Sequence, residues 1–451
     1  MFTDTICALA TAPGGALGII RISGPAALSA VSSISQIDCD HAAANTVHYT
    51  HIVNADGETI DEVMVSIFRA PHSYTGEDAV EISCHGSHYI LNKVLELLVQ
   101  HGCRMANPGE YTQRAYLNGK MDLSQAEAVA DLIASTNRTT HQMAMSQLKG
   151  HFSSELKKLR DQLLQLTSLL ELELDFSDHE DLEFADRTAL LNLANKIDGR
   201  ILQLANSFET GQALRNGIPV AIVGKTNVGK STLLNCLLGD DRAIVSAVHG
   251  TTRDTIEDII DINGIQFRFI DTAGLRQTSD EVEQIGIERT KQKIKEARIV
   301  LWLMDACPTN EERTEMDKLI EGKGHICVHT KADLIDTQNF IPFITPLLLI
   351  SAKTGHGIEA LKKRIMEEAH VSGLTGNEVI ITNARHYDAL CRAHTSIEHV
   401  IDGLSPSTSL PPDLLAEDLQ QVLDILAEIT GGQITPQETL NNIFAHFCIG
   451  K

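Results

Sequence analysis

Hydrophobic and polar residues follow a period of about two along much of the first 118 residues, in short runs separated by turn signals. The runs rich in β-branched residues cover 16–23, 46–53, 62–68 and 79–84. A stretch with helical spacing of its apolar residues follows over 87–100. This mixture predicts an α+β domain over residues 1–118.

From residue 119 the pattern becomes helical. Apolar residues recur every three or four positions, as in Leu156, Leu159, Leu163, Leu164 and Leu166, and no proline interrupts 124–207. The spacing predicts the first part of a helical domain over 119–215, and the return of this pattern after residue 383 predicts the second part, over 373–451.

Between these two parts, strands and helices alternate. Alternation over 216–372 predicts βαβ crossovers and a mainly parallel sheet with helices on both faces. Insertion of such a domain at an exposed connection is easy because domain termini often lie close together. The chain is therefore predicted to be a multidomain α/β protein whose sheet domain is inserted in the helical domain.

Composition supports several globular domains. A chain of 451 residues is too long for one hydrophobic core. Its 43% hydrophobic and 22% charged residues are typical of folded proteins and exclude a disordered or fibrous chain. The 60 acidic and 37 basic side chains give a net charge of −23, which argues against a generic nucleic-acid binder.

The nine cysteines contain no CxxC pair, so neither a disulfide framework nor a zinc knuckle is predicted. The first residues lack the basic stretch and apolar run of a signal peptide, and no apolar run reaches membrane-spanning length. We therefore expect a cytoplasmic protein with no membrane attachment.

The strongest local motif lies at 224–231, where the sequence Gly-Lys-Thr-Asn-Val-Gly-Lys-Ser follows an apolar strand and precedes an apolar helix. It fits the phosphate-binding pattern GxxxxGK[ST], whose backbone N–H groups face phosphates at a helix N-terminus. Lys230 would reach the β and γ oxygens and Ser231 would bind magnesium. An ordinary glycine-rich turn is the alternative, which the strand–loop–helix setting disfavours. The predicted phosphate-binding residues are Asn227, Val228, Gly229, Lys230, Ser231 and Thr232.

Three further segments follow predicted strands and fall at the same rim of a parallel sheet. Asp271 with Thr272, Ala273 and Gly274 would lie near magnesium and the γ-phosphate. The other two segments are Thr330, Lys331 and Asp333, and Ser351, Ala352 and Lys353. Asp333 can accept hydrogen bonds from N1–H and the exocyclic amine of guanine, which adenine lacks, so GTP is favoured over ATP. Thr330 stands where this guanine motif usually has Asn.

The order of these motifs resembles the translation-factor-related small GTPases, whose first switch matches 250–254 with Thr252 closing on magnesium. Leu275 stands where Ras-like enzymes have a catalytic Gln, and an apolar side chain cannot orient water. Asn227 is a candidate ligand of a monovalent cation and Glu283 a candidate water-orienting acid. From the residues alone, a turn-favouring Asn and a solvated helix acid remain the simpler interpretations.

Segments outside the inserted domain extend the resemblance to the whole chain. They are residues 12–24 (APGGALGIIRISG), residues 74–78 (YTGED) and the final residues 447–451 (FCIGK). Together these segments resemble the MnmE (TrmE) family of tRNA modification GTPases, and the Cys-Ile-Gly-Lys terminus is highly specific. Ribosome-associated GTPases share the nucleotide motifs but not these flanks.

The resemblance implies a set of site residues in the inserted domain. Potassium would be bound by Asn227, Ser246, Val248 and Thr251, within a nucleotide-binding loop that also includes Ala247, His249 and Gly250. Magnesium would be bound by Ser231 and Thr252, and Glu283 would orient the attacking water, with Lys230 and Thr252 also catalytic. GTP hydrolysis in this family accelerates when two GTPase domains dimerise around potassium.

The resemblance also implies a folate site and partners. The first domain would bind 5-formyltetrahydrofolate or a related tetrahydrofolate through Arg21, Glu81, Lys120 and Lys451, and would hold the homodimer together. Without the resemblance each of these is a surface charge. Cys448 is either a nucleophile or a buried, inert cysteine.

The implied activity is that of a potassium-dependent GTPase. With an MnmG-like flavoprotein, which would carry the FAD that this chain lacks, it would convert C5 of the wobble uridine (position 34) of certain tRNAs to an aminomethyl or carboxymethylaminomethyl derivative. The tRNA would be held jointly with that partner. The alternative is a GTP-controlled ribosome-assembly binding protein, which the acidic region after residue 383 disfavours.

Overall fold

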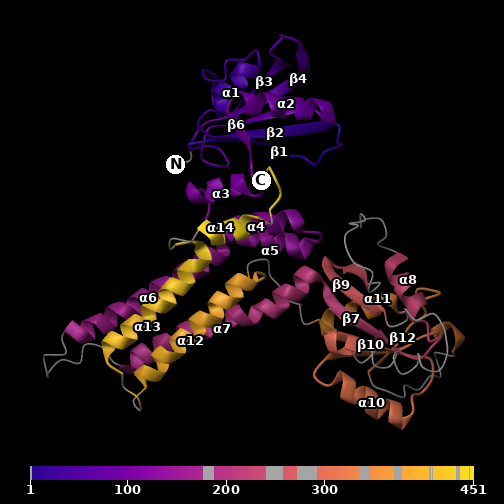
Figure 1. Ribbon diagram of the computed structural model, residues 1–451. Coiled ribbons are helices and arrows are strands. Elements are labelled where there is room, and N and C mark those ends of the chain that lie inside the picture. The colour runs from indigo at the N-terminus through magenta and orange to yellow at the C-terminus, as the bar shows by residue number, and fades with distance from the viewer. Residues whose placement is uncertain are drawn as a thin grey trace. The chain divides into compact units, whose positions relative to one another are not determined.

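A computed structural model describes residues 3–175, 187–239, 257–271, 292–335, 346–369, 378–405, 408, 410–432, 437–445 and 447–450 (Figure 1). The chain forms two compact units, one of residues 1–134, 144–201 and 388–451 and the other of residues 135–143 and 202–387. Within the described residues, none of the helices is long and apolar enough to cross a membrane.

The first unit begins with a six-stranded sheet in the order β3-β4-β5-β2-β1-β6. Its strands are β1 Thr5–Leu9, β2 Leu17–Ser23, β3 Thr46–Val53, β4 Thr59–Phe68, β5 Ala79–His85 and β6 Cys103–Met105. Neighbouring strands are antiparallel except β1 and β6. The predicted α+β domain is confirmed, and all four predicted strands and the predicted helix are present.

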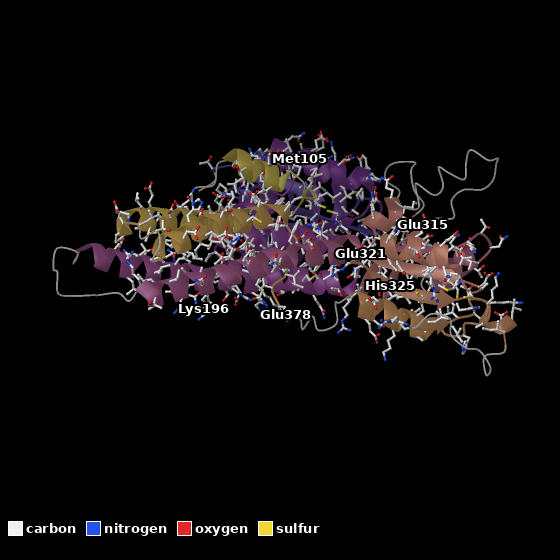
Figure 2. The ribbon with its side chains drawn as sticks, turned by 90° about the horizontal axis from the view of Figure 1, so that it is seen from below. Met105, Lys196, Glu315, Glu321, His325 and Glu378 are labelled. Atoms are coloured by element: carbon white, nitrogen blue, oxygen red, sulfur yellow. The ribbon has the colours of Figure 1, made fainter. Side chains whose placement is uncertain are left out.

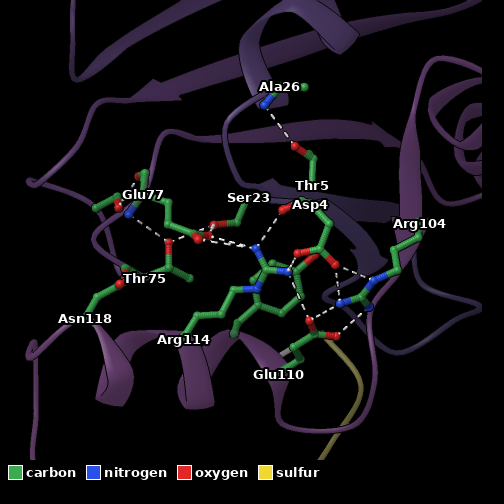
Figure 3. A network of polar contacts seen from close by, with 12 residues as sticks. Asp4, Thr5, Ser23, Ala26, Thr75, Glu77, Arg104, Glu110, Arg114 and Asn118 are labelled. Carbon is green, nitrogen blue, oxygen red and sulfur yellow. Dashed lines mark hydrogen bonds and ion pairs between the residues drawn. The ribbon is translucent and has the colours of Figure 1, made fainter. Parts of the chain in front are cut away.

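Two helices, α1 Ala27–Ile34 and α2 His88–Gln100, cover one face of this sheet, because their apolar sides share one core cluster with the strands. On the opposite face, Tyr111 of α3 Glu110–Leu117 packs on Ile6 and Ala8 of β1. A polar network fastens α3 there: the buried guanidinium of Arg114 donates to Asp4, Glu77 and Glu110 (Figure 3).

The helical part of the first unit is built from chain segments that precede and follow the second unit's sheet in the sequence (Figure 1). The helices that lie wholly in it are α4 Leu123–Ala134, α6 His151–Asp175, α13 Pro412–Thr430 and α14 Gln437–Phe444. Three others, α5 Arg138–Leu148, α7 Arg187–Asn216 and α12 Ala384–Leu404, continue into the second unit. Of the five leucines used to predict α6, four are buried and Leu164 is 39% exposed, because it lies off the apolar stripe.

The second unit contains another six-stranded sheet, in the order β12-β11-β10-β7-β9-β8. Its strands are β7 Ile218–Val223, β8 Glu257–Ile262, β9 Ile265–Asp271, β10 Ile299–Met304, β11 Gly324–His329 and β12 Leu347–Leu349. All pairs are parallel except β8 with β9, which confirms the mainly parallel sheet.

Helices lie on both faces of this second sheet, as predicted. Apolar residues of α8 Lys230–Gly239 and α11 Ile358–Glu368 share one core cluster with the strands. On the other face, Ile320 of α10 Asn310–Ile320 and the apolar residues Ile294 and Ala297 pack on β7 and β10. Because its strands are mainly parallel, this sheet brings several loops to one rim.

Charged side chains lie at the surface of both units, as Lys196 of α7 and Glu315 and Glu321 of the sheet domain show (Figure 2).

Candidate functional site: a nucleotide rim and a paired charge on the first sheet

The loop between β7 and α8 has the shape that its glycines were expected to permit. Asn227 and Gly229 have left-handed backbones, with φ of 61° and 101°. A Cβ on Gly224 would lie 2.5 Å from the carbonyl oxygen of Leu303, so only glycine fits at this approach to β10. The loop therefore curls tightly before the first turn of α8.

The side chain of Lys230 folds back onto this loop. Its Nζ donates to the carbonyl oxygens of Gly224 (2.5 Å) and Lys225 (3.0 Å). An ammonium held above backbone N–H groups at a helix N-terminus creates a strongly positive setting for phosphate oxygens. Val228 is buried in the core and fixes the loop from below, while Ser231 and Thr232 are exposed on the first turn of α8.

Asp271 is the last residue of β9 and pairs in register with Ile222 of β7. The backbone thus places it on the strand next to β7, which leads into the phosphate loop. Several predicted residues lie outside the described part of the chain: the loop from Ser246 to Thr252, the segment from Thr272 to Gly274, and Glu283.

Thr330 follows β11 and ties the predicted guanine motif to the phosphate loop. Its buried hydroxyl donates to the carbonyl oxygen of Val228 at 2.6 Å, and its N–H donates to the carbonyl oxygen of Met304 at 2.9 Å. The side chain that replaces the usual Asn is therefore used as a link between two loops rather than left to solvent.

Asp333 is held by the next loop along the rim. The buried hydroxyl of Ser351 donates to its Oδ1 at 2.6 Å, and this hydrogen bond lowers the pKa of the Asp333 carboxyl. Lys353, exposed in the same turn, lowers that pKa further by its charge. An ionised carboxylate in a fixed orientation suits recognition of the two guanine N–H donors.

Two ion pairs at the rim were not predicted from the sequence. Lys331, whose φ is 57°, pairs with Asp305 at 2.7 Å, and Lys225 of the phosphate loop pairs with Glu312 at 2.7 Å. Glu312 also accepts from the N–H of Thr309 in the capping box of α10. The spacing Thr309-x-x-Glu312 is a sequence signal for that cap, but nothing in the sequence indicates the pairing with Lys225.

The first sheet brings Arg21 and Glu81 together as neighbours on β2 and β5. Arg21 donates from Nε to Oε1 of Glu81 at 2.8 Å, so these two predicted folate residues form an ion pair. Tyr74 and Tyr111 flank the guanidinium, each with its ring centroid 5.7 Å from Cζ. Tyr74 lies in a stretch that the sequence singled out, whereas Tyr111 carries no such signal.

Lys120 and Cys448 also lie in the first unit. The exposed Lys120 donates from Nζ to the carbonyl oxygen of Pro71 at 2.9 Å. Cys448 is exposed, which contradicts the alternative of a buried cysteine, and its backbone carbonyl accepts from the N–H of Gly109 at 3.3 Å. Lys451 lies outside the described residues.

A mainly parallel sheet, a phosphate-binding loop and a guanine-type carboxylate on the same rim define the chain as a P-loop protein of the GTPase class. Family models agree and are more specific: residues 123–448 match the MnmE helical domain, and residues 5–120 match the GTP-binding protein TrmE N-terminus. The chain belongs to the MnmE family of tRNA modification GTPases.

Full-length relatives support this assignment. The chain is 52% identical over 470 residues to the tRNA modification GTPase MnmE of Bacteroides thetaiotaomicron, with 100% of each chain covered. It is 50% identical over 467 residues to that of Flavobacterium johnsoniae, with 99% of each covered. Among solved structures, a point variant of Aquifex aeolicus Era bound to GDP·AlF4− is 29% identical, covering 40% of this chain and 66% of that chain, with a TM-score of 0.28. So low a TM-score leaves the family to rest on the two models and the full-length relatives.

Proposed function

We propose that this protein is a potassium-dependent GTPase of the cytoplasm that modifies the wobble uridine of certain tRNAs. It acts with an MnmG-like flavoprotein carrying FAD and installs an aminomethyl or carboxymethylaminomethyl group on C5 of uridine 34, using a folate one-carbon unit. The observation that carries the proposal is the common rim, where Lys230 of the phosphate loop and the oriented Asp333 belong to loops linked through Thr330.

In this proposal the described residues of the rim bind GTP and select its base. The N–H groups at the start of α8 and the ammonium of Lys230 hold the phosphates, while Asp333 accepts from the guanine N–H groups. Ser231, exposed on the first turn of α8, and Asn227, exposed in the loop, present oxygen atoms suited to magnesium and potassium respectively. When bound there, these cations would supply positive charge next to the phosphates, which favours transfer of the γ-phosphate to water.

The proposed folate site rests on the Arg21–Glu81 pair. A carboxylate can accept from the guanidine-like edge of a pterin, and a guanidinium or ammonium can pair with the glutamate carboxylates of folate. Arg21 and Lys120 supply the cations, and the ring of Tyr74 beside Arg21 offers an aromatic face for a flat ligand. The residues present therefore fit a tetrahydrofolate.

The homodimer is supported by an apolar patch on the uncovered face of the first sheet. Val47, Tyr49 and Met64 are 58%, 63% and 43% exposed, and Tyr49 lies opposite Met64 in the β3–β4 register. Exposed aromatic and aliphatic side chains gathered on one face are typical of a protein–protein interface. A second copy of this chain is the proposed occupant.

Joint binding of tRNA with the flavoprotein is supported by charge. A net charge of −23 repels a polyanion, so this chain by itself is expected to bind tRNA weakly. Family membership favours this tRNA function over the ribosome-assembly alternative, which shares only the nucleotide motifs.

The decisive experiment is mass spectrometry of wobble uridines from cells that lack the protein. We expect the C5-modified nucleosides at position 34 to disappear, to return with the wild-type gene, and not to return with Asp333→Asn, which loses an acceptor for guanine. Unaltered uridines would remove the tRNA function. Normal uridines with defective ribosomal particles would favour the ribosome-assembly alternative.

A further inference from the structure

The C-terminal tail of the chain is docked on the first domain through close glycine contacts. A Cβ on Gly109 would lie 2.8 Å from the Phe444 carbonyl oxygen and 2.8 Å from Cβ of Phe447. The ring centroids of Phe444 and Phe447 lie 5.1 Å apart, in a core cluster that these two residues share with apolar residues of α4. The tail after α14 is thus seated against the start of α3 before it reaches the sheet.

Gly450 carries the tail onto the sheet itself. Its φ is 92°, a left-handed backbone that other residues rarely adopt, and a Cβ would lie 2.4 Å from the carbonyl oxygen of Leu9. Both the backbone conformation and the space at the end of β1 therefore require glycine at this position. The seat brings the Gly450 carbonyl oxygen within 3.1 Å of Nη1 of Arg21, which donates to it.

Three residues bind Arg21, two through its guanidinium and one through its backbone carbonyl. Glu81 accepts from Nε and lies 2.7 Å from Nη2, Gly450 accepts from Nη1, and the hydroxyl of Tyr111 donates to the backbone carbonyl of Arg21 at 2.7 Å. The Arg21 side chain is only 20% exposed, so few other orientations are open to it. A guanidinium fixed in this way is preorganised to bind an anionic or flat ligand.

We propose that Gly450 is a positioning residue of the folate site, which acts through its carbonyl on Arg21, so that seating of the C-terminal tail and folate binding are coupled. This inference rests on the proposed folate function. When the tail is seated, Arg21 is preoriented beside Glu81; when the tail leaves, the guanidinium loses one of its two acceptors and its fixed direction. Binding of folate correspondingly stabilises the seated tail, because coupling between two binding events is reciprocal.

The test is calorimetric titration of the full-length protein with 5-formyltetrahydrofolate. Gly450→Ala is expected to weaken binding about tenfold, the usual scale for loss of one charge-assisted hydrogen bond and its preorganisation. Gly432→Ala is the matched control, since a Cβ there would meet its nearest atom, Cβ of Ala427, at an ordinary 3.6 Å, and it should bind like the wild type. Circular dichroism verifies that both variants are folded.

A double-mutant cycle separates positioning from general loss of stability. If Gly450 acts through Arg21, then adding Gly450→Ala to Arg21→Ala weakens folate binding no further, whereas two independent structural effects would add. Equal affinity of Gly450→Ala and wild type, or additive losses in the cycle, overturns the inference while the folate function stands. A wild-type protein that does not bind the folate at all overturns the folate function and this inference with it.

Discussion

Two hydroxyl groups determine how the guanine-selecting segment is held, and neither role is visible in the motif itself. Thr330 donates to the phosphate loop and Ser351 donates to Asp333. A hydroxyl offers a single donor proton, and the shortest hydrogen bond that each of these hydroxyls donates goes to Val228 and to Asp333 respectively. The guanine-binding carboxylate and the phosphate loop are therefore linked through buried polar contacts rather than through the ligand alone.

Ser351→Ala tests whether the hydroxyl of Ser351 orients Asp333. We expect GTP affinity to fall about tenfold, because Asp333 loses the hydrogen bond that orients it and that lowers its pKa. The pKa of Asp333 would rise toward its usual range, which still leaves the carboxylate ionised at pH 7, so the loss comes from orientation. Titration with a fluorescent GTP analogue measures it.

Thr314→Ala is the control for Ser351→Ala, since the exposed hydroxyl of Thr314 donates within α10, to the carbonyl oxygen of Asn310. Its affinity for GTP should match the wild type. GTP binding by Ser351→Ala that is as tight as the wild type would contradict the proposed role of Ser351.

Glu283→Ala tests the residue proposed to orient water, which lies outside the described residues. We expect nucleotide binding to stay near normal while hydrolysis falls about 10²–10⁴-fold, the range typical of losing a positioned acid or base. Single-turnover phosphate release separates the two effects. The neighbouring Glu281→Ala should hydrolyse GTP normally, and undiminished hydrolysis by Glu283→Ala would reject the assignment.

At the scale of elements, α3 is fixed to the first sheet by a buried charge network rather than by apolar packing alone (Figure 3). Arg114 is fully buried and pairs with Asp4 at 2.9 Å, Glu77 at 3.2 Å and Glu110 at 3.1 Å. Arg104 also binds Glu110 from β6. Several carboxylates thus depend on one guanidinium.

Arg114→Met should destabilise the protein by about 3–5 kcal/mol, because it removes the arginine partner of the largely buried Glu77 and leaves the buried Glu110 with Arg104 alone. Thermal unfolding followed by circular dichroism measures the change. Lys93→Met is the control: its pair with Glu96 lies on the surface of α2, and loss of such an exposed, solvent-screened pair costs little stability. Equal melting temperatures for Arg114→Met and Lys93→Met would contradict the importance of the network.

The same network predicts how stability depends on acid. Burial alone would raise the pKa of Glu110, but hydrogen bonds from Arg104, the Asn107 backbone and Arg114 outweigh it and hold that pKa below its usual value. A carboxyl whose pKa is lowered on folding stabilises the fold fully above its unfolded pKa, and this contribution disappears as the pH falls through the lowered value. We expect unfolding curves measured from pH 7 down to pH 3 to lose stability at the acid end.

Arg114→Met supplies the comparison for this acid dependence. The variant removes one of the two arginine partners of Glu110, so the pKa of Glu110 would rise although Arg104 still lowers it, and the variant should lose less additional stability below pH 5 than the wild type. Parallel curves for the two proteins would argue against the network as the source.

In the first domain the sequence predicted four strands and one helix and missed β1, β6, α1 and α3. β1 is buried at nearly every position and β6 has three residues, so neither shows an alternation. The buried residues of α1 do follow a helical spacing, but this helix has only eight residues. β8 was missed although Asn263-Gly264 marks the hairpin to β9, with φ of 55° and 85°. For the site, motifs placed Lys230 and Asp333 on the rim, but the contacts between loops depend on packing across distant segments.

At the scale of the whole molecule, the two ends of the chain meet in the first unit, where Gly450 accepts from Arg21. The proposed folate site is therefore built from the first strands and the last described residues. The nucleotide rim lies in the other unit, between them in sequence. The helices α5, α7 and α12 have residues in both units and therefore connect the two sites along the chain.

The rate of GTP hydrolysis tests the proposed potassium dependence and the proposed pairing of GTPase domains together. We expect GTP hydrolysis to be at least roughly tenfold faster in potassium than in sodium at equal ionic strength, and to rise more than linearly with protein concentration, because in the proposed mechanism potassium would take the place of an arginine finger between two paired GTPase domains. Asn227→Gly should abolish the difference between the two salts: glycine keeps the left-handed backbone at φ 61° but removes the oxygen ligand. Asn263→Gly makes the same change at φ 55° in the β8–β9 turn and should keep the potassium response. Equal rates in the two salts for the wild type would exclude the potassium mechanism, and a normal potassium response in Asn227→Gly would remove Asn227 from the cation site.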